Sequence, residues 1–322
     1  MSMVVAGLVG LVLAGAGGQP QAQTEATATG VSASLDALNV AATTADVQTY
    51  LGRLDPELVW IGNDITERWT YPEFAAFVRP YFERGAGWTY TSRARRVFLA
   101  PDPCACLAWV DDVLDSRTYG TAVSTAVMRR GEDGEWRVWR NALTYPIPND
   151  LADGMTDEIK AWEAAQPPAE RTSDAVTPET APIAEALDSF HQAAARADGA
   201  IYFDLFTPDA VYRGTDVTEL WTLDEFRAFA EPYFASGRGW TYVPRERHIA
   251  IARTDCACVA WFDEILDSQS YGTSRGTGVL VRGADGRWRI AYYALTFPIP
   301  NALARDMTSR IRAAAEASPA NP

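Results

Sequence analysis

The chain carries one order of hydrophobic and polar patterns twice, and the second copy shows it most clearly. That copy opens with apolar residues at the spacing of one helix face, namely Leu187, Phe190, Ala194 and Ala197. A shorter apolar segment at 202–206 ends in a Thr-Pro-Asp turn, and a brief strand follows at 210–213. Thr222 and Glu225 then form a capping box, because hydroxyl and carboxylate each satisfy a backbone N–H at a helix start. The helix that they begin is predicted to bury an aromatic face of Phe226, Phe229 and Tyr233.

Alternation of period two replaces the helical pattern after Gly239. Because helices come first and antiparallel strands afterwards, the copy is predicted to be an α+β domain with helices on one face of a curved sheet. A hairpin turn is predicted at 284–286 and a further short helix, outside that core, at 303–317. The predicted strands are 245–252, 258–267, 275–281 and 288–297.

The whole pattern is duplicated without a gap. Shifted by 152 positions, residues 34–165 match 186–317, and roughly half of the aligned positions are identical. A period this long indicates duplicated domains, since the units of solenoid proteins span about 20 to 50 residues. Residues 166–182 are rich in Pro, Thr, Ala and Glu, which is typical of a linker. We therefore predict two domains, at 33–165 and 183–317, joined in one chain; their packing as a covalent pseudo-dimer is what the family resemblance described below implies.

Composition narrows the classes of partner. The 322 residues are 48% apolar, enough for two buried cores, and carry a formal net charge of −14. Such a charge repels phosphate backbones and anionic lipids, so no nucleic-acid partner is expected. Lys160 is the only lysine, which excludes Schiff-base chemistry from the second copy. The sequence holds no nucleophile-elbow, phosphate-loop, dinucleotide or metalloprotease motif, and no cofactor is expected.

The N-terminus predicts export. An apolar run at 4–16 is well short of the ~20 residues that a membrane span needs, and it ends in an A-x-A pattern at 14–16. We interpret 1–23 as a signal peptide and expect a periplasmic or secreted protein with no stable membrane insertion. The residues before the apolar run include no Lys or Arg, so the alternatives are an uncleaved N-terminal anchor or a mis-set start codon.

Five motifs of the second copy carry a family resemblance: Trp221–Phe226, Gly237–Tyr242, Trp261–Glu264, Tyr271–Gly276 and Pro298–Asn301. With this order of elements, both copies resemble the nuclear transport factor 2-like superfamily and, more narrowly, the SnoaL-like proteins of bacteria. The resemblance implies two tandem cone-shaped domains, each with N-terminal helices packed on a curved antiparallel sheet, an apolar pocket between them, and pairing through the sheets. Such proteins include ketosteroid isomerases, polyketide cyclases, dehydratases and non-enzymatic binding modules, so the fold alone selects no function.

One departure from the family pattern weighs against isomerase chemistry. The general-base Asp that the resemblance implies on the first strand falls at Arg213 or Gly214, and in the first copy at Ile61 or Gly62. None of these residues accepts a proton as a carboxylate does, so any proton transfer must use other groups.

A single strand of the second copy holds the strongest candidate acid. Alternation places Asp263 on one face beside Trp261, where partial desolvation raises a carboxyl pKa and suits it to acid–base work. The alternative is structural: Asp263 pairs with Arg247 on the neighbouring strand, as Asp111 does with Arg95 in the first copy.

His191 and His248 are the only histidines, and His248 is the better candidate for an acid–base or orienting role because imidazole titrates near neutrality. An isomerase, cyclase or dehydratase would combine Asp263 and His248 with Tyr242 or Tyr271. The alternative is a strand-surface histidine without a function. Two histidines without matching spacing make no zinc site, and no metal is assigned to them.

The implied pocket has many aromatic candidates. Gly276 and Gly278 alternate on one strand face, which leaves room for a ligand or for close packing. The ligand-binding candidates are Trp221, Trp240, Trp261, Tyr271, Arg275 and Tyr293 in the second copy, and Trp69, Trp88, Trp109 and Asp111 in the first. If only one copy binds, we expect the second, which differs from the first at Arg213, Glu264, Arg275 and Tyr293 in place of Ile61, Asp112, Val123 and Asn141.

Four cysteines form Cys-x-Cys pairs at equivalent positions, 104 with 106 and 256 with 258. In an oxidising compartment disulfides persist, and three connectivities are possible. Adjacent positions on one strand face are too far apart for a bond, but a local bridge within each pair is feasible if the pairs lie in hairpin turns. Free thiols and a metal site are the alternatives.

Three interpretations of function therefore remain. The first, which we favour, is an exported binding module for a small hydrophobic or aromatic molecule, without chemistry. The second is the proton-transfer enzyme built on Asp263, His248 and a tyrosine. The third makes the first copy a partner that only covers the sheet of the second.

Overall fold

Most of the predicted signal peptide lies outside the described residues, and residues 19–23 begin the first helix. Within the described part of the chain, no helix combines the length and the apolar character needed to cross a membrane. The computed structural model describes residues 19–101, 104–167, 172–254 and 256–317.

Each copy folds as helices, a six-stranded sheet and a final helix. Repeat one consists of α1 (Gln19–Thr44), α2 (Val47–Gly52), β1 (Leu54–Ile61), β2 (Arg68–Thr70), α3 (Tyr71–Glu83), β3 (Tyr90–Leu99), β4 (Leu107–Ser116), β5 (Gly120–Arg130), β6 (Trp136–Thr144) and α4 (Asn149–Ala164). Repeat two consists of α5 (Ala181–Ala195), α6 (Gly199–Asp204), β7 (Phe206–Arg213), β8 (Leu220–Thr222), α7 (Leu223–Ala235), β9 (Tyr242–Ile251), β10 (Val259–Ser268), β11 (Gly272–Arg282), β12 (Trp288–Thr296) and α8 (Asn301–Ala317).

The two sheets share one topology. Their strand orders are β2-β1-β6-β5-β4-β3 and β8-β7-β12-β11-β10-β9. The pairs β1 with β6 and β7 with β12 are parallel, and the other neighbours are antiparallel. The four long strands of the second copy were predicted to within a few residues, whereas β2 and β8 were missed because a three-residue strand shows no period.

The capped helix is confirmed, but its aromatic face is only partly buried. In α7 the backbone N–H of Thr222 donates to the Glu225 carboxylate at 2.8 Å, and repeat one has the same capping box. Phe226 is buried, whereas Phe229 and Tyr233 remain 44% and 40% exposed. The prediction that all three are buried was therefore wrong, because the outer two border a groove.

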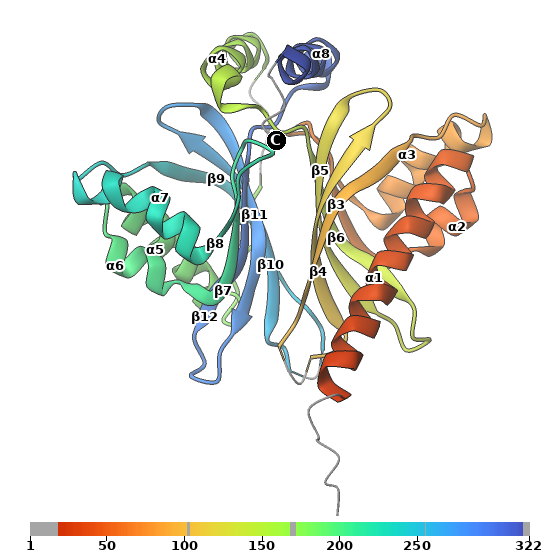
Figure 1. The fold of residues 1–322 in the computed structure, drawn as a ribbon, viewed down its shortest axis with the longest axis horizontal. Coiled ribbons are helices and arrows are strands. Elements are labelled where there is room, and N and C mark those ends of the chain that lie inside the picture. Colours follow the sequence, from red (N-terminus) through yellow and green to blue (C-terminus); the bar gives the residue numbers. More distant parts are fainter. Residues whose placement is uncertain (1–18, 102–103, 168–171, 255, 318–322) are drawn as a thin grey trace, which may run out of the picture.

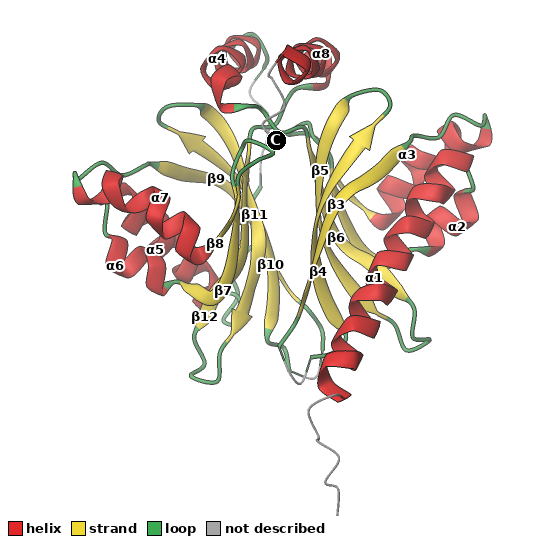
Figure 2. Ribbon diagram, in the orientation of Figure 1, coloured by secondary structure: helices red, strands yellow, loops and turns green. Residues whose placement is uncertain are grey.

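The sheets face each other in the middle of the molecule, and the helices preceding the long strands cover their outer faces (Figure 1). Figure 2 shows the same layers, with strands inside and helices outside. A shared core lies between the sheets and includes Trp109 and Trp139 of repeat one with Trp261 and Tyr292 of repeat two. Two tandem cone-shaped α+β domains that pair through their sheets are thus confirmed.

The final helix of each repeat packs on the opposite repeat. α4 lies against β11 of repeat two, and α8 lies against β5 of repeat one. The two helices also meet each other, with Met155 and Ile159 of α4 in one buried cluster with Met307 and Ile311 of α8. The tails are therefore exchanged between the two halves of the chain (Figure 1).

Candidate functional site

Each repeat has an aromatic groove between its sheet and its capped helix. The groove of repeat one measures about 360 Å³, and its rings include Trp60, Trp69, Phe77, Tyr81, Trp88 and Tyr90. The groove of repeat two measures about 270 Å³, and its rings include the equivalents Tyr212, Trp221, Phe229, Tyr233, Trp240 and Tyr242. Small-molecule sites typically enclose about 300–1,000 Å³, so the groove of repeat one falls within this range and that of repeat two lies just below it.

A residue of the opposite repeat closes each groove. Asn301, the first residue of α8, donates from Nδ2 to Glu67 Oε1 at 2.7 Å in the groove of repeat one. Asn149, the first residue of α4, donates in the same way to Glu219 at 2.8 Å in repeat two. Glu67 packs closely on Gly62, so that a Cβ on residue 62 would stand 2.9 Å from the Cβ of Glu67 and would displace this side chain. Each groove therefore holds a carboxylate that the other half of the chain orients.

Repeat one also has an inner recess beside its groove. The recess measures about 40 Å³ and shares four lining residues with the groove, Trp60, Trp88, Tyr90 and Leu143. Its polar wall includes Asn141, which is 3% exposed and accepts at Oδ1 from Ser124 Oγ at 2.7 Å. Among the described residues, Asn141 Nδ2 has no hydrogen-bond partner. A buried amide N–H of this kind is ready to donate to a ligand.

Asp112 supplies a carboxyl group to the wall of the recess. Its carboxylate accepts from Ser92 Oγ at 2.6 Å and from Arg95 Nε at 2.7 Å. Burial raises the pKa of Asp112 above its ordinary value, and the bonds from Ser92 and Arg95 offset this only in part. The recess thus contains a carboxyl group whose protonated form is favoured more than usual.

The interior of repeat two is filled at the equivalent place. Tyr293 replaces Asn141, is 1% exposed, and stacks beside Tyr212 with ring centroids 5.3 Å apart. A Cβ on Gly276 would stand 2.7 Å from the Tyr293 hydroxyl, and one on Gly278 would stand 2.2 Å from a backbone carbonyl. Of the two predicted reasons for these glycines, close packing is the one that the structure supports.

The interior of repeat two also contains a buried cluster of charged side chains. Glu264 lies 2.9 Å from His191 Nε2 and accepts from Arg247, whose Nη1 reaches Asp188 at 2.8 Å. Burial disfavours the charged carboxylate, but His191 and Arg247 outweigh burial and lower the pKa of Glu264. His191, set aside in the sequence in favour of His248, is thus the histidine that lies inside the cone.

The predicted ion pairs of Asp263 and Asp111 were wrong by one position of register. Asp263 lies opposite His248 on the neighbouring strand, and Arg247 lies opposite Glu264. Asp263 instead accepts from Arg68 of repeat one at 2.9 Å and from Trp261 Nε1 at 3.1 Å. It therefore faces the other sheet rather than the interior of its own cone.

Asp111 behaves in the same way. Arg95 lies opposite Asp112, so Asp111 cannot pair with it. Asp111 accepts two bonds from Arg213 of repeat two, at 2.9 and 2.5 Å, and one from the Tyr292 hydroxyl at 2.6 Å. All three groups are almost fully buried between the sheets.

The candidate residues therefore fall into three places. The catalytic combination is not assembled, because Asp263 and His248 lie between the sheets while Tyr242 lies in the groove. Burial raises the pKa of Tyr242 well above its ordinary value, so it remains a neutral hydroxyl. The candidates in the grooves are Trp69, Trp88, Trp221, Trp240, Tyr242 and Tyr271. Those between the repeats are Trp109, Asp111, Trp261, Asp263, His248 and Arg275. Tyr293 lies in the filled interior of repeat two.

Several polar residues of the grooves and recess were missed as site residues. Part of their signal was the repeated Pro-Ile-Pro-Asn motif, together with acidic residues at the same position of both copies, whereas Asn141 has no such signal because its equivalent is Tyr293. No pattern in the sequence shows that a tail residue reaches the opposite domain. The missed residues include Glu67, Asp112, Asn141, Asn149, Glu219 and Asn301.

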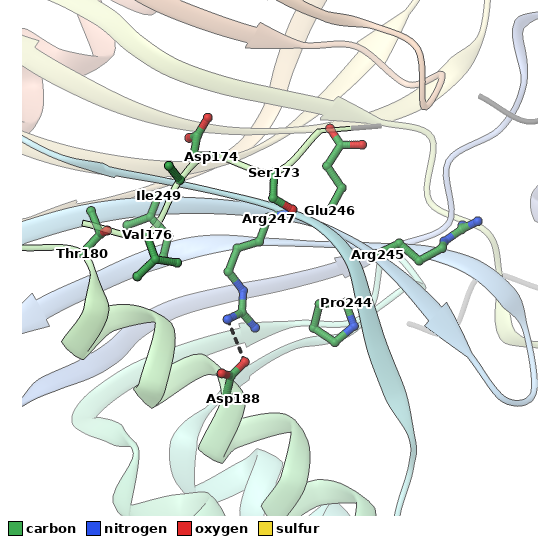
Figure 3. A pocket seen from close by; sticks show the side chains of 11 residues that line it. Ser173, Asp174, Val176, Thr180, Asp188, Pro244, Arg245, Glu246, Arg247 and Ile249 are labelled. Atoms are coloured by element: carbon green, nitrogen blue, oxygen red, sulfur yellow. Dashed lines mark hydrogen bonds and ion pairs between the residues drawn. The ribbon is translucent and has the colours of Figure 1, made fainter. Parts of the chain in front are cut away.

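A further cavity, of about 310 Å³, lies between the linker, α5 and β9 (Figure 3). Ser173 Oγ accepts from the backbone N–H of Arg247 at 3.1 Å, and the N–H of Asp174 donates to the Arg247 carbonyl at 3.1 Å. The linker thus adds to the edge of the second sheet. The charged residues of this cavity are of both signs, with Arg245 and Arg247 beside Asp174, Asp188 and Glu246.

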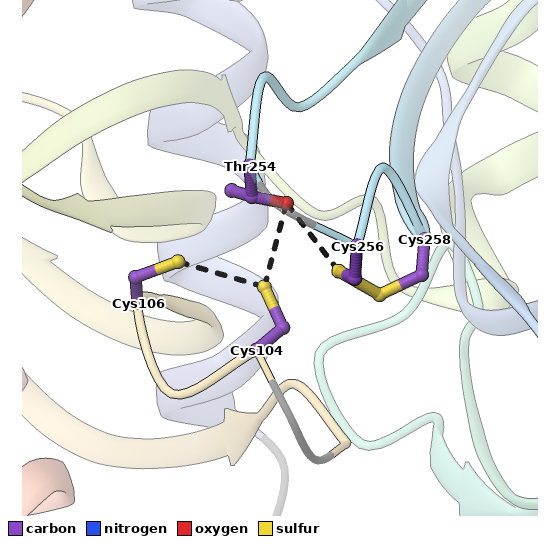
Figure 4. Close-up of a disulfide and its surroundings, with 5 residues drawn as sticks. All are labelled: Cys104, Cys106, Thr254, Cys256 and Cys258. Atoms are coloured by element: carbon purple, nitrogen blue, oxygen red, sulfur yellow. Dashed lines mark hydrogen bonds between the residues drawn. A yellow bond between two sulfur atoms is a disulfide. The ribbon is translucent and has the colours of Figure 1, made fainter.

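The cysteines lie in the loops that join β3 to β4 and β9 to β10. Cys256 and Cys258 form the local disulfide that was predicted for a turn. Cys104 and Cys106 carry thiols, with their sulfurs 3.6 Å apart (Figure 4). The two copies therefore differ in redox state at equivalent positions.

The chain has partial similarity to solved structures and matches one protein-family model. A solved ketosteroid isomerase-like protein from Erwinia carotovora atroseptica is 20% identical, covers 39% of this chain and 100% of its own, and has a TM-score of 0.30. An NTF2-like protein of unknown function from Pseudomonas putida is 15% identical, covers 40% of this chain and 92% of its own, and has a TM-score of 0.33. No curated protein matches the chain. The SnoaL-like domain model matches residues 31–148 and again 183–300. With one family model matching each half of the duplicated fold, the chain belongs to the SnoaL-like domain family and contains two tandem copies of that domain.

Proposed function

We propose that repeat one binds a small hydrophobic or aromatic molecule, with rings in the aromatic groove and one polar group in the recess. The buried amide of Asn141 carries this proposal, because its Nδ2 has no partner among the described residues and lies beside the groove. A buried polar group without a partner costs about 1–3 kcal/mol, which a hydrogen-bond acceptor on a ligand would offset.

The contrast between the repeats supports a site in repeat one, although the sequence favoured repeat two. Arg213 and Arg275 of repeat two bind repeat one instead of lining a groove, with Arg275 Nη1 donating to the Gly62 carbonyl at 2.7 Å. Tyr293 fills the place that the recess occupies in repeat one. Repeat two keeps only its outer groove in this proposal.

The decisive test makes repeat one resemble repeat two. The variant Ser124→Gly with Asn141→Tyr introduces the residues that fill the second interior, so the fold already accommodates them. We expect its affinity for N-phenyl-1-naphthylamine, a neutral aromatic fluorescent probe, to fall at least tenfold. Unchanged affinity would contradict the site.

A matched pair of variants locates the probe. Phe77→Leu alters the groove of repeat one, and Phe229→Leu makes the same change in repeat two. We expect the first to weaken probe binding and the second to leave it unchanged. Native mass spectrometry of the purified protein then shows whether a small molecule is retained from the cell.

A second candidate function is proton transfer by Asp112. It is favoured by the raised pKa of this carboxyl group and by its position in the wall of the recess. The test is deuterium exchange at the α-carbon of 2-tetralone, a neutral aromatic ketone. Asp112→Asn should abolish protein-catalysed exchange while Asp263→Asn preserves it. If the unaltered protein exchanges deuterium no faster than the buffer does, proton transfer is contradicted and binding remains as the proposed function.

We also propose that the protein is exported. The apolar run at 4–16 and the A-x-A pattern at 14–16 support this. Cell fractionation should recover the protein outside the cytoplasm, and the intact mass should show a chain shortened at its N-terminus. A full-length chain in the cytoplasm would contradict the proposal.

A further inference from the structure

The two Cys-x-Cys loops meet although they lie in different repeats. Cys104 is 3% exposed and belongs to the core shared by the two sheets, against which Cys106, Cys256 and Cys258 also pack. Figure 4 shows the hydroxyl of Thr254, which belongs to the same loop as Cys256 and Cys258, joined by dashed lines to the sulfurs of Cys104 and Cys256. Four sulfur atoms from two domains therefore occupy one partly buried space.

The sulfur of Cys104 lies close to the disulfide of the other repeat. Its Sγ and those of Cys256 and Cys258 all lie within 4.8 Å of one another. The Thr254 hydroxyl lies 3.7 Å from Cys104 Sγ and 3.4 Å from Cys256 Sγ, so these two sulfurs share one neighbour. Cys106 Sγ is 3.6 Å from Cys104 Sγ on the other side.

We propose that this cluster is a cross-repeat disulfide site, in which Cys104 displaces Cys258 and bonds to Cys256. The Cys104 thiolate attacks Cys256 Sγ, the bond between Cys256 and Cys258 breaks, and Cys258 leaves as a thiolate that takes up the proton lost by Cys104. One disulfide is replaced by another and two thiols remain, so the step needs neither an oxidant nor a reductant.

The exchange converts a local link into a link between domains. The bond between Cys256 and Cys258 spans a sequence separation of 2, so it constrains little of the unfolded chain. A bond from Cys104 to Cys256 closes a loop of about 150 residues, and the stabilisation from a disulfide grows with the loop that it closes. The site would therefore fasten the two sheets together at this end of their shared core.

Peptide mapping of the unaltered protein tests the exchange. Trypsin releases Cys104 and Cys106 in peptide 97–117, and Cys256 and Cys258 in peptide 254–275. The protein is incubated at pH 8.5 without oxidant, its thiols are blocked with N-ethylmaleimide, and the peptides are analysed without reduction. We expect the linked pair of peptides to increase at least tenfold over a sample blocked at once at pH 5, with two blocked thiols per chain throughout.

Two single variants identify the attacking sulfur. Cys104→Ser should abolish the linked pair, whereas Cys106→Ser should preserve it. Three results would overturn the proposal: peptides that stay separate at pH 8.5, a second local disulfide that leaves no thiols, or one zinc ion per chain bound by four thiols. If a variant does not fold, the mapping of the unaltered protein still decides.

Discussion

At the residue scale, the polar groups between the sheets explain why the two halves match each other. Asp111 is bonded to Arg213 and Asp263 to Arg68, so each carboxylate receives its cation from the opposite repeat. The arginines come from different strands, β7 and β2. The two carboxylates therefore stand at equivalent positions of the repeats, but their arginines do not. This asymmetry makes the interface specific to these two different repeats.

The Asp111 pair predicts a large cost when it is broken. Arg213→Met leaves Asp111, 1% exposed, without its cation, and removal of one partner of a buried pair typically costs about 3–5 kcal/mol. Urea unfolding should show this loss. Arg68→Met, whose side chain is 32% exposed, is the matched control and should lose less stability. Equal losses of unfolding free energy in the two variants would contradict the expectation that breaking the more deeply buried ion pair costs more.

Individual residues also show how far the sequence alone reaches. The six groove aromatics among the candidates could be named because they recur in both copies beside the capped helix. The role of Asp263 could not, since alternation separates two faces of a strand without showing which face a second domain covers. The wrong ion pairs predicted for Asp263 and Asp111 arose in the same way, because a shift of one residue in the register of two strands exchanges the two faces of a strand.

At the element scale, the linker and β9 form one unit. Linker residues 173 and 174 are bonded to the backbone of Arg247, and His248 follows directly on the strand. His248 lies 3.0 Å from the Asp174 carboxylate and 2.9 Å from that of Glu246. A single imidazole thus connects the linker to the sheet edge.

This connection predicts a pH dependence of stability. Burial opposes the charge on His248, but Glu246, Asp263 and Asp174 outweigh burial and the nearby Arg68, and the pKa of His248 is raised above 6.5. The stabilisation is therefore fully present below pH 6.5 and is lost as the pH rises through the raised pKa. Urea unfolding from pH 5.5 to 8.5 should show the decline, and His248→Gln should show a smaller one. Parallel profiles for the two proteins would contradict the assignment.

The exchanged tails make a prediction for the grooves. Asn301→Ala removes the amide that orients Glu67, while Asn149→Ala removes its equivalent from repeat two. A lost hydrogen bond of about 1 kcal/mol corresponds to roughly a fivefold change in affinity. On the proposed site in repeat one, Asn301→Ala should weaken binding of the neutral naphthyl probe by about this factor, and Asn149→Ala should not. A loss of affinity in Asn149→Ala but not in Asn301→Ala would instead indicate a site in repeat two.

At the scale of the whole molecule, the repeat and the order of patterns were enough to predict two α+β domains, while the cone shape and the pairing through the sheets came from the resemblance to the SnoaL-like proteins. The exchange of α4 and α8 could not be predicted, because the helical pattern shows an apolar face but not which domain that face covers. The open recess of repeat one and the filled interior of repeat two could not be predicted from the sequence either. They depend on whether a side chain such as Tyr293 turns into the space, which is a property of packing rather than of period.

Separating the repeats tests the pseudo-dimer. Each half alone would expose the shared core around Trp109, Trp139, Trp261 and Tyr292, which are buried in the intact chain. Residues 19–167 and 172–317, expressed together as two chains, should form a one-to-one complex on size-exclusion chromatography with light scattering. Either half alone should self-associate or precipitate. Two independently soluble monomers would contradict an obligate interface.

The fusion of the two cones has a consequence for how their interiors can evolve. In a homodimer of one cone, every mutation appears on both sides of the twofold axis, so a cavity is either kept twice or lost twice. Here one gene encodes both sides separately, and a tyrosine fills one cavity while an asparagine leaves the other open. One half is thereby free to become a solid support, while its twin keeps the chamber and continues to adapt to whatever enters it.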